Sequence, residues 1–232
     1  MPLAGQRVLI IGGSSGMGLA AARALAGLGA EVCIAGRSRA RLDSALASID
    51  GPATGHVVDF TDAASLAALF DELGAIDHLV LTAASNAAGG PFAAISADAL
   101  RAALEGKLIG YWQSLQAALP HLRRDGSVVM LTGAASRTAL PGTAGYAAVN
   151  GALTQWAQTL ARELAPLRVN VVSPGYVPAS ADEAQLREAG KGLPVGRAGT
   201  PEDVAAAIVF LLDSEFTTGA LLDIDGGARM AL

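Results

Sequence analysis

Residues 7–28 read RVLIIGGSSGMGLAAARALAGL. The apolar run from Arg7 to Ile11 predicts a buried strand, and the Ala- and Leu-rich run from Leu19 to Leu28 predicts a helix. Between them stand glycines at positions 12, 16 and 18. Glycines in such a turn let the backbone bend sharply and come close to a phosphate group, which the free amides of the next helix stabilise. The stretch therefore predicts a phosphate-binding turn at the start of an α/β fold.

The rest of the chain repeats the alternation of a short β-branched run with a longer segment of helical period. Six further runs predict strands: Glu31 to Ala35, Gly55 to Val58, His78 to Leu81, Ser127 to Leu131, Val169 to Val172 and Leu221 to Ile224. Parallel strands need crossover connections, which helices usually supply. We therefore expect a single doubly wound Rossmann-type α/β domain over residues 1–232, with a seven-stranded parallel sheet.

Composition indicates a compact globular protein with 52% hydrophobic and 16% charged residues. The net charge of -5 and the lack of a Lys/Arg run argue against nucleic-acid binding. The single cysteine, Cys33, lies in an apolar run, which favours a buried structural thiol and fits a reducing cytoplasm. We see neither a basic and apolar leader nor about 18 uninterrupted apolar residues, so we expect neither secretion nor membrane insertion.

Two helix starts are marked by capping residues. Thr200-Pro201-Glu202-Asp203 offers a capping hydroxyl, a proline in the first turn and two acids that complement the helix dipole. Ser96 caps a long helix predicted over 97–119, whose apolar stripe includes Lys107. A lysine on that stripe either points inward or extends along the surface toward water.

The glycine spacing GxxxGxG resembles that of the short-chain dehydrogenase/reductase family, and the resemblance extends over nearly the whole chain. Asp59 follows the third predicted strand, where this family holds the adenine ring, and Ser173-Pro174-Gly175 follows the sixth, where it frames the nicotinamide. Residues 196–204 (GRAGTPEDV) and 219–227 (GALLDIDGG) are similar to the family's C-terminal signature. The resemblance implies a nicotinamide-dependent oxidoreductase and a homodimer or homotetramer formed through its two long central helices.

Cofactor contacts follow from the resemblance, residue by residue. They are expected at Gly12, Ser14, Ser15, Gly16, Met17, Gly18, Arg37, Asp59, Phe60, Ala83, Ala84, Tyr146, Asn150, Pro174, Gly175 and Val177. An acid at the end of the second strand would favour NAD, whereas Gly36 followed by Arg37 stands there. Because the planar guanidinium suits a phosphate, NADP(H) is predicted over NAD(H), which remains the alternative. Arg37 as a plain surface residue is the other interpretation.

The catalytic positions depart from the family pattern of Asn, Ser and Tyr-x-x-x-Lys. Only Tyr146 is retained: the motif reads YAAVN and ends in Asn150, and Gly133 lies where the serine is expected, thirteen residues before Tyr146. The family's asparagine position is occupied by Lys107, in the stretch KLIG. Asparagine and lysine have thus exchanged places at two positions that the family puts on either side of one water.

We hypothesise that Tyr146 is the proton donor and that Lys107 supplies the cation that tunes it. Asn150 then binds a ribose hydroxyl or a water, and Thr132 or Ser136 partly replaces the serine. The structural alternatives are that Lys107 covers its helix with its methylene stem, that Asn150 is a surface amide, and that strand alternation turns Thr132 away.

The predicted reaction is reduction of a carbonyl compound by NADPH, or the reverse alcohol oxidation, since a largely neutral tyrosine donates a proton better than it accepts one. A short segment, residues 176–195, is expected to cover a small or medium apolar substrate. His56 and His121 lack further ligands at useful spacing, so no metal is expected. Three other functions stay open: a catalytically silent NADP(H) sensor, a partner subunit, and a non-redox enzyme such as a dehydratase.

Overall fold

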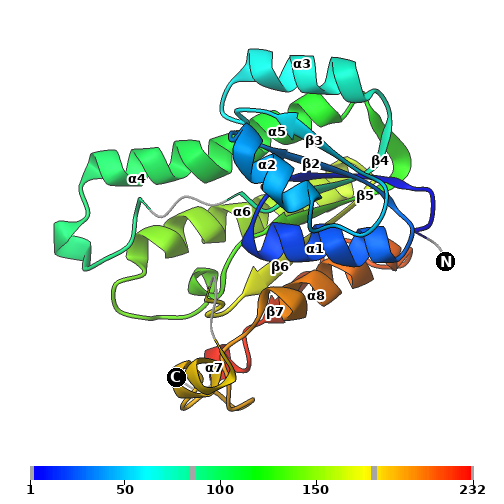
Figure 1. Ribbon diagram of the computed structural model, residues 1–232. Coiled ribbons are helices and arrows are strands. Elements are labelled where there is room, and N and C mark those ends of the chain that lie inside the picture. Colours follow the sequence, from blue (N-terminus) through cyan, green and yellow to red (C-terminus); the bar gives the residue numbers. More distant parts are fainter. Residues whose placement is uncertain (1–2, 84–86, 179–181, 231–232) are drawn as a thin grey trace.

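The computed structural model describes residues 3–83, 87–178 and 182–230. Seven parallel strands form one sheet in the order β3-β2-β1-β4-β5-β6-β7 (Figure 1), which confirms the predicted Rossmann-type fold. The strands are β1 (Arg7–Ile11), β2 (Glu31–Gly36), β3 (Ala53–Val57), β4 (Ile76–Leu81), β5 (Leu122–Leu131), β6 (Arg168–Pro174) and β7 (Leu221–Ile224).

Several strands are longer than predicted, and β5 shows why. The structure starts β5 at Leu122 rather than Ser127, and its added part contains Arg123, Arg124 and Asp125, which are exposed. The pairing with β4 passes from Ile76 opposite Leu122 to His78 opposite Ser127, so these residues form an irregularity in the ladder, which a search for apolar runs misses. Strand β3 is shifted from the predicted Gly55 to Val58, beginning at Ala53 and ending at Val57.

Helices cover both faces of the sheet and enclose two separate hydrophobic cores. One core lies under α1 (Gly16–Gly27), α2 (Arg39–Leu46) and α8 (Pro201–Asp213). The other lies under α3 (Ala63–Leu73), α4 (Ala97–Ala103), α5 (Gly110–Ala118) and α6 (Ala144–Glu163). The short helix α7 (Glu183–Ala189) stands away from the sheet, at the lower end of the view in Figure 1.

The long helix predicted over 97–119 is interrupted, so that prediction needs correction. A π-helical segment, η2 (Leu104–Ile109), separates α4 from α5 and contains Lys107. A π turn inserts an extra residue into the helical repeat and is frequent at functional sites. Apolar periodicity cannot reveal it, because the stripe continues on either side. The described residues also form 3-10 turns: η1 (Phe92–Ala94), η3 (Ala134–Ser136) and η4 (Ala228–Met230).

Helix caps and helix starts agree with the sequence to different degrees. The Ser96 hydroxyl accepts from the Ala99 amide, and Thr200 and Asp203 form a capping box at α8, as predicted. Helix α1 begins at Gly16 rather than Leu19, so its first turn includes Gly16 and Gly18 of the phosphate turn. Helix α7 begins at Glu183, and Asp182 provides its cap.

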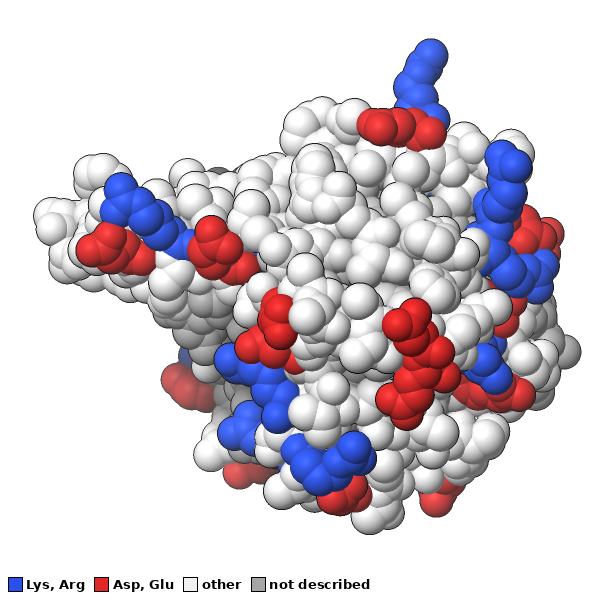
Figure 2. All heavy atoms as spheres, turned by 90° about the horizontal axis from the view of Figure 1, so that it is seen from above, with Lys and Arg blue, Asp and Glu red and all other residues white. Residues whose placement is uncertain are grey.

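The strand order reverses direction between β1 and β4, which defines the edge where this fold binds ligands. Positive and negative side chains intermingle on the face seen in Figure 2, without a broad area of one sign. Cys33 is buried, as predicted, and desolvation raises the pKa of its thiol. Within the described ranges, no helix combines the length and the apolarity needed to cross a membrane.

Candidate active site

The glycine turn after β1 forms a cradle that excludes side chains. Gly12 and Gly16 have positive φ angles of 93° and 52°, a region that favours glycine. A side chain at Gly18 would collide with the Gly12 carbonyl oxygen, so helix α1 approaches β1 closely. Ser15 precedes α1 without a side-chain cap, which leaves first-turn amides available. This cradle fits the pyrophosphate of a dinucleotide, which glycine turns and helix N-termini bind.

The ends of β2 and β3 bring Arg37 and Asp59 into electrostatic contact. Asp59 accepts hydrogen bonds from the amide and hydroxyl of Thr61, and these bonds, with a smaller contribution from Arg37, lower the pKa of its carboxyl group. Ser14 lies next to the end of β2, 3.5 Å from where a side chain at Gly36 would begin. Arg37 and Asp59 are both exposed and sit beside the glycine turn, where an adenosine moiety would lie.

Two predicted cofactor residues, Met17 and Phe60, are partly buried. The ring of Phe60 covers Gly110 so closely that a side chain there would collide with it. Met17 packs against the core under α1. The contacts of these two residues with a cofactor stay a prediction.

The end of β4 contains a residue that the sequence analysis did not single out. Thr82 is buried, its hydroxyl donates to the Ile11 carbonyl at 3.1 Å, and it would clash with any side chain at Gly12. Ala83 accepts a hydrogen bond from the Tyr111 hydroxyl at 2.8 Å. Ala84 lies outside the described residues. Thr82 thus holds the glycine turn against β4, and its position directly after a strand was the available signal.

Lys107 points inward and contacts Asn150. Its side chain is 8% exposed, and its Nζ atom donates to Asn150 Oδ1 at 2.9 Å and to the Thr132 carbonyl oxygen at 3.1 Å. Both acceptors of this buried amine are neutral oxygens. Burial lowers the pKa of Lys107 to about 8. The interpretation of Lys107 as a surface residue along its helix is therefore wrong.

Asn150 occupies the space next to Gly133. Its side chain is 7% exposed, and its Nδ2 atom lies 3.0 Å from where a side chain at Gly133 would begin. A side chain at that position would require the amide, whose oxygen accepts from Lys107, to shift by a few tenths of an ångström. Lys107, Gly133 and Asn150 therefore form one packing arrangement.

Neither hydroxyl suggested as a substitute for the serine is freely available. Thr132 lines the cavity described below, but its hydroxyl donates to the Val172 carbonyl oxygen at 3.4 Å. Ser136 is not among the residues lining that cavity, and its buried Oγ finds no partner within the described part of the chain.

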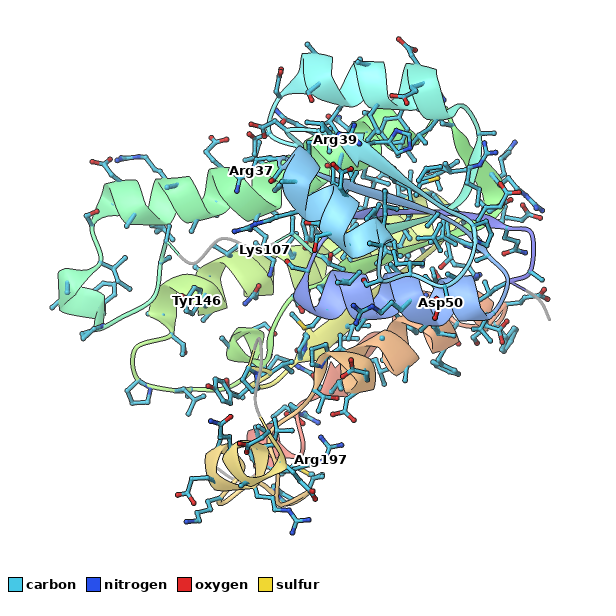
Figure 3. All side chains as sticks on the ribbon, in the orientation of Figure 1. Arg37, Arg39, Asp50, Lys107, Tyr146 and Arg197 are labelled. Carbon is cyan, nitrogen blue, oxygen red and sulfur yellow. The ribbon has the colours of Figure 1, made fainter. Side chains whose placement is uncertain are left out.

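Tyr146 is half-buried on the first turns of α6, with the segment after β4 packed against it. A side chain at Gly89 would collide with the Tyr146 hydroxyl, and a side chain at Gly145 would collide with the Ala88 carbonyl oxygen. Figure 3 shows Lys107 extending from the π segment between α4 and α5 toward α6, which carries Tyr146. The phenol therefore has a fixed environment.

A cavity of about 930 Å³ joins these groups. Lys107, Thr132, Tyr146 and Asn150 all line it, so the structure brings together the four residues of the catalytic hypothesis. The cofactor residues Pro174, Gly175 and Val177 line it as well. The remaining walls come mainly from apolar residues of the segment before α6 and of residues 176–195.

The floor near Pro174 is built by C-terminal residues that sequence reasoning assigned only to a family signature. Gly175 donates its amide to the Ile224 carbonyl oxygen, and the Cα atom of Asp225 lies 2.7 Å from where a side chain at Gly175 would begin. Asp223 pairs with Arg137 and with Arg229. These contacts fix the C-terminal turn against the cavity.

The histidines show no metal site. His56 contacts Glu72, and His121 stacks on Phe70. Among the residues that the structure describes, no group of three His, Cys, Asp or Glu side chains is arranged to hold a metal ion.

Comparison with known proteins identifies the family. Residues 12–229 match a family model described as enoyl-(acyl carrier protein) reductase. Short-chain dehydrogenase/reductase ATR9 of Stachybotrys chlorohalonatus is 33% identical over 97% of this chain and 97% of its own length. The chain belongs to the short-chain dehydrogenase/reductase family. It is therefore an oxidoreductase of that type, in a family that uses NAD(H) or NADP(H) and acts on small molecules.

Other relatives cover the chain as fully. A 3-oxoacyl-[acyl-carrier-protein] reductase of Bos taurus is 31% identical over 96% of this chain and 98% of its own length. A solved structure described as a short chain dehydrogenase/reductase family protein superposes with a TM-score of 0.88 at 32% identity, covering 99% of this chain and all of its own. The similarity to reductases is consistent with carbonyl reduction.

Proposed function

We propose that this protein uses NADPH to reduce the carbonyl group of an apolar small or medium-sized compound. The observation that carries the proposal is the contact between Lys107 and Asn150 in a cavity also lined by Tyr146. The cofactor, when bound in the glycine cradle, supplies a hydride to the carbonyl carbon. The protein's own residues orient the substrate and provide the proton for its oxygen.

Tyr146 is the proton donor in this proposal, and Lys107 makes the donation easier. A cation stabilises a nearby phenolate by about 4 kcal/mol at 4 Å and about 2 kcal/mol at 8 Å for an effective dielectric constant near 20. An uncharged amide cannot match this stabilisation. Because the pKa of Lys107 is lowered only to about 8, most of its amines carry a proton at neutral pH. The lysine therefore supplies its charge from the opposite wall of the cavity.

Asn150 has a double part in the proposed site. Its oxygen holds the Lys107 ammonium in place, and its Nδ2 group remains as a donor near Gly133. We assign that donor to a ribose hydroxyl or a water. Thr132 contributes its carbonyl oxygen to Lys107, which makes it a positioning residue.

NADP(H) is the proposed cofactor because of Arg37. This arginine follows β2 directly, where an acid would select NAD. It is exposed and lies near enough to Asp59 to influence that carboxyl group. A guanidinium at this place binds a 2′-phosphate with charge-assisted hydrogen bonds.

A catalytically silent NADP(H)-binding protein is the second candidate. The Thr132 hydroxyl donates to the Val172 carbonyl oxygen, and Ser136 does not line the cavity; both observations favour this candidate, because neither hydroxyl then replaces the serine. The buried ammonium of Lys107 favours the enzyme. Burying a charge away from water costs free energy, and titratable groups in such environments are common at functional sites.

A homodimer or homotetramer in the cytoplasm is part of the proposal. The stacked rings of Trp112 and Trp156 join α5 to α6, and Trp112, Ile109 and Leu119 are partly exposed on α5 and at its ends. Exposed apolar side chains beside one another mark interaction surfaces. The buried free thiol of Cys33 fits a reducing compartment.

The test combines cofactor binding with turnover. NADPH oxidation is followed over a panel of aldehydes and ketones, and NADPH affinity is measured separately by fluorescence titration. We expect the native protein to oxidise NADPH with at least one compound of the panel. In Lys107→Met, turnover should fall at least about hundredfold, which is within the range that general acid catalysis contributes, while the affinity for NADPH stays unchanged. Lys107→Arg should keep part of the activity.

A matched control and the contrary outcomes separate the candidates. Arg101→Met removes an exposed cation of α4 that pairs with Asp98, and it should leave both turnover and NADPH affinity unchanged. NADPH binding without any turnover would support the silent protein. Substrate conversion without a change in NADPH absorbance would point to a non-redox enzyme. Full activity in Lys107→Met would refute the role of the lysine.

A further inference from the structure

A second hollow of about 710 Å³ lies beside the cavity that contains Tyr146. We refer to this hollow, lined by Pro91, Phe92, residues 138–144 and Ala147, as the annex. Thr138, Leu140 and Thr143 line both the cavity and the annex. These three residues therefore lie between the two spaces.

The annex presents a hydrocarbon surface. None of its lining residues carries a charge. Its two hydroxyl groups are used internally, since Thr138 donates to the Ala134 carbonyl oxygen at 3.0 Å and Thr143 to the Leu140 carbonyl oxygen at 2.8 Å. Phe92 and Leu140 nevertheless expose 81% and 42% of their surface. Water molecules find few hydrogen-bond partners on such a lining, so an apolar ligand that displaces them would bind with a favourable free energy.

The backbone around the annex is held in place. The segments before α4 and before α6 run side by side, at the left of Figure 1, and the Gly90 amide donates to the Gly142 carbonyl oxygen at 2.9 Å. Gly142 has a φ of 81°, which favours glycine in this turn. A preformed site binds an apolar group with little ordering cost.

The annex lies next to the reacting group. Ala147 lines it, whereas the preceding residue, Tyr146, lines the main cavity. Because Leu140 lines both spaces, a carbonyl group held by Tyr146 would have the annex beyond Leu140. A compound that fills both spaces needs a hydrocarbon arm attached to its carbonyl carbon.

We propose that the annex binds the aliphatic arm of the substrate, so that the protein selects carbonyl compounds with a long apolar chain. This inference rests on the proposed function, because it takes the reacting carbonyl to lie at Tyr146. Leu140 stands at the junction and Phe92 at the outer end. A free chain end is the fitting occupant because the annex continues the cavity and contains no charged partner for a polar headgroup.

The test is a series of straight-chain aldehydes from butanal to dodecanal. We expect kcat/KM to rise along the series, mainly through a fall in KM, by about twofold to fourfold for each methylene that becomes buried. In Leu140→Gln and in Phe92→Ser, the ratio of kcat/KM for dodecanal to that for butanal should fall at least tenfold. Phe210 is an exposed apolar residue of α8 that lines neither space, and Phe210→Ser should keep the native ratio.

The outcomes distinguish this inference from the function on which it rests. Turnover without a chain-length trend, or a trend that survives in both annex variants, overturns the inference and leaves carbonyl reduction intact. If no aldehyde is reduced, calorimetry measures the binding of dodecanol as an unreactive probe. Binding that Leu140→Gln weakens at least tenfold supports the inference that the annex holds an aliphatic chain. The lack of any binding overturns it. A self-association that Leu140→Gln abolishes, without any trend, would assign the annex to a second copy of this chain.

Discussion

The Nζ atom of Lys107 lies 2.9 Å from the Oδ1 atom of Asn150, so the two residues of the hypothesised exchange contact each other directly. The lysine comes from the π segment between α4 and α5, and the asparagine comes from α6. The two side chains therefore come from different helical segments and meet at one hydrogen bond.

Reversing the exchange tests whether the two positions work as a pair. Lys107→Asn alone removes the cation, and Asn150→Lys alone places two amines together. Both should reduce kcat/KM at least about hundredfold. The double variant restores one amine and one amide and should recover more than tenfold over either single variant. Additive losses in the kinetic double-mutant cycle would show that the positions act independently.

The pKa of Lys107, lowered to about 8 by burial, predicts opposite effects of pH on activity and stability. Turnover should fall as the pH rises through about 8, because the ammonium loses its charge. Folding stability should rise relative to Lys107→Met from about pH 8 toward the unfolded pKa of about 10.5, since only the unfolded state still binds that proton. Stopped assays and denaturant titrations at matched pH values measure both trends. A parallel fall of the two quantities would contradict the assignment.

Gly89→Ala tests the placement of the Tyr146 phenol. The added methyl group would collide with the Tyr146 hydroxyl, so kcat should fall at least tenfold while NADPH affinity is kept. Gly151→Ala is the matched control: it lies on α6 with no atom within 4 Å of the added methyl group. It should be active and slightly more stable, by about 0.5–1 kcal/mol. Equal activity in both variants would show that the phenol position does not matter.

Arg37→Ala tests cofactor choice. Losing the guanidinium should weaken NADPH binding about tenfold or more and leave NADH binding nearly unchanged. Arg41→Ala removes another exposed arginine from α2 and serves as the control. Equal weakening of both cofactors, measured by fluorescence titration, would remove the argument for NADP.

Trp112→Glu tests the assembly surface. Trp112 is 44% exposed and stacked on Trp156, so a carboxylate there would be buried in an interface formed by α5 and α6. We expect light scattering to show a shift toward monomer. Phe216→Glu alters a fully exposed aromatic residue outside these helices and should leave the assembly unchanged. An unchanged mass in Trp112→Glu would place the interface elsewhere.

The fold could be predicted because its signals are local. The glycines at 12, 16 and 18 and the β-branched runs identify the turn and the strands without tertiary information. The site could be predicted only in part. Lys107 was on an apolar stripe, which indicated burial, but the π segment that contains it leaves no trace in the hydrophobic pattern. Thr82 and Gly89 act through close packing, which no single stretch of sequence encodes.

The contact between Asn150 Nδ2 and the space beside Gly133 makes three positions interdependent. A serine at position 133 would require the Asn150 amide to shift by a few tenths of an ångström, and an asparagine at position 107 would remove the positive charge from the pocket. The effects of substitutions at positions 107, 133 and 150 on activity should therefore be non-additive.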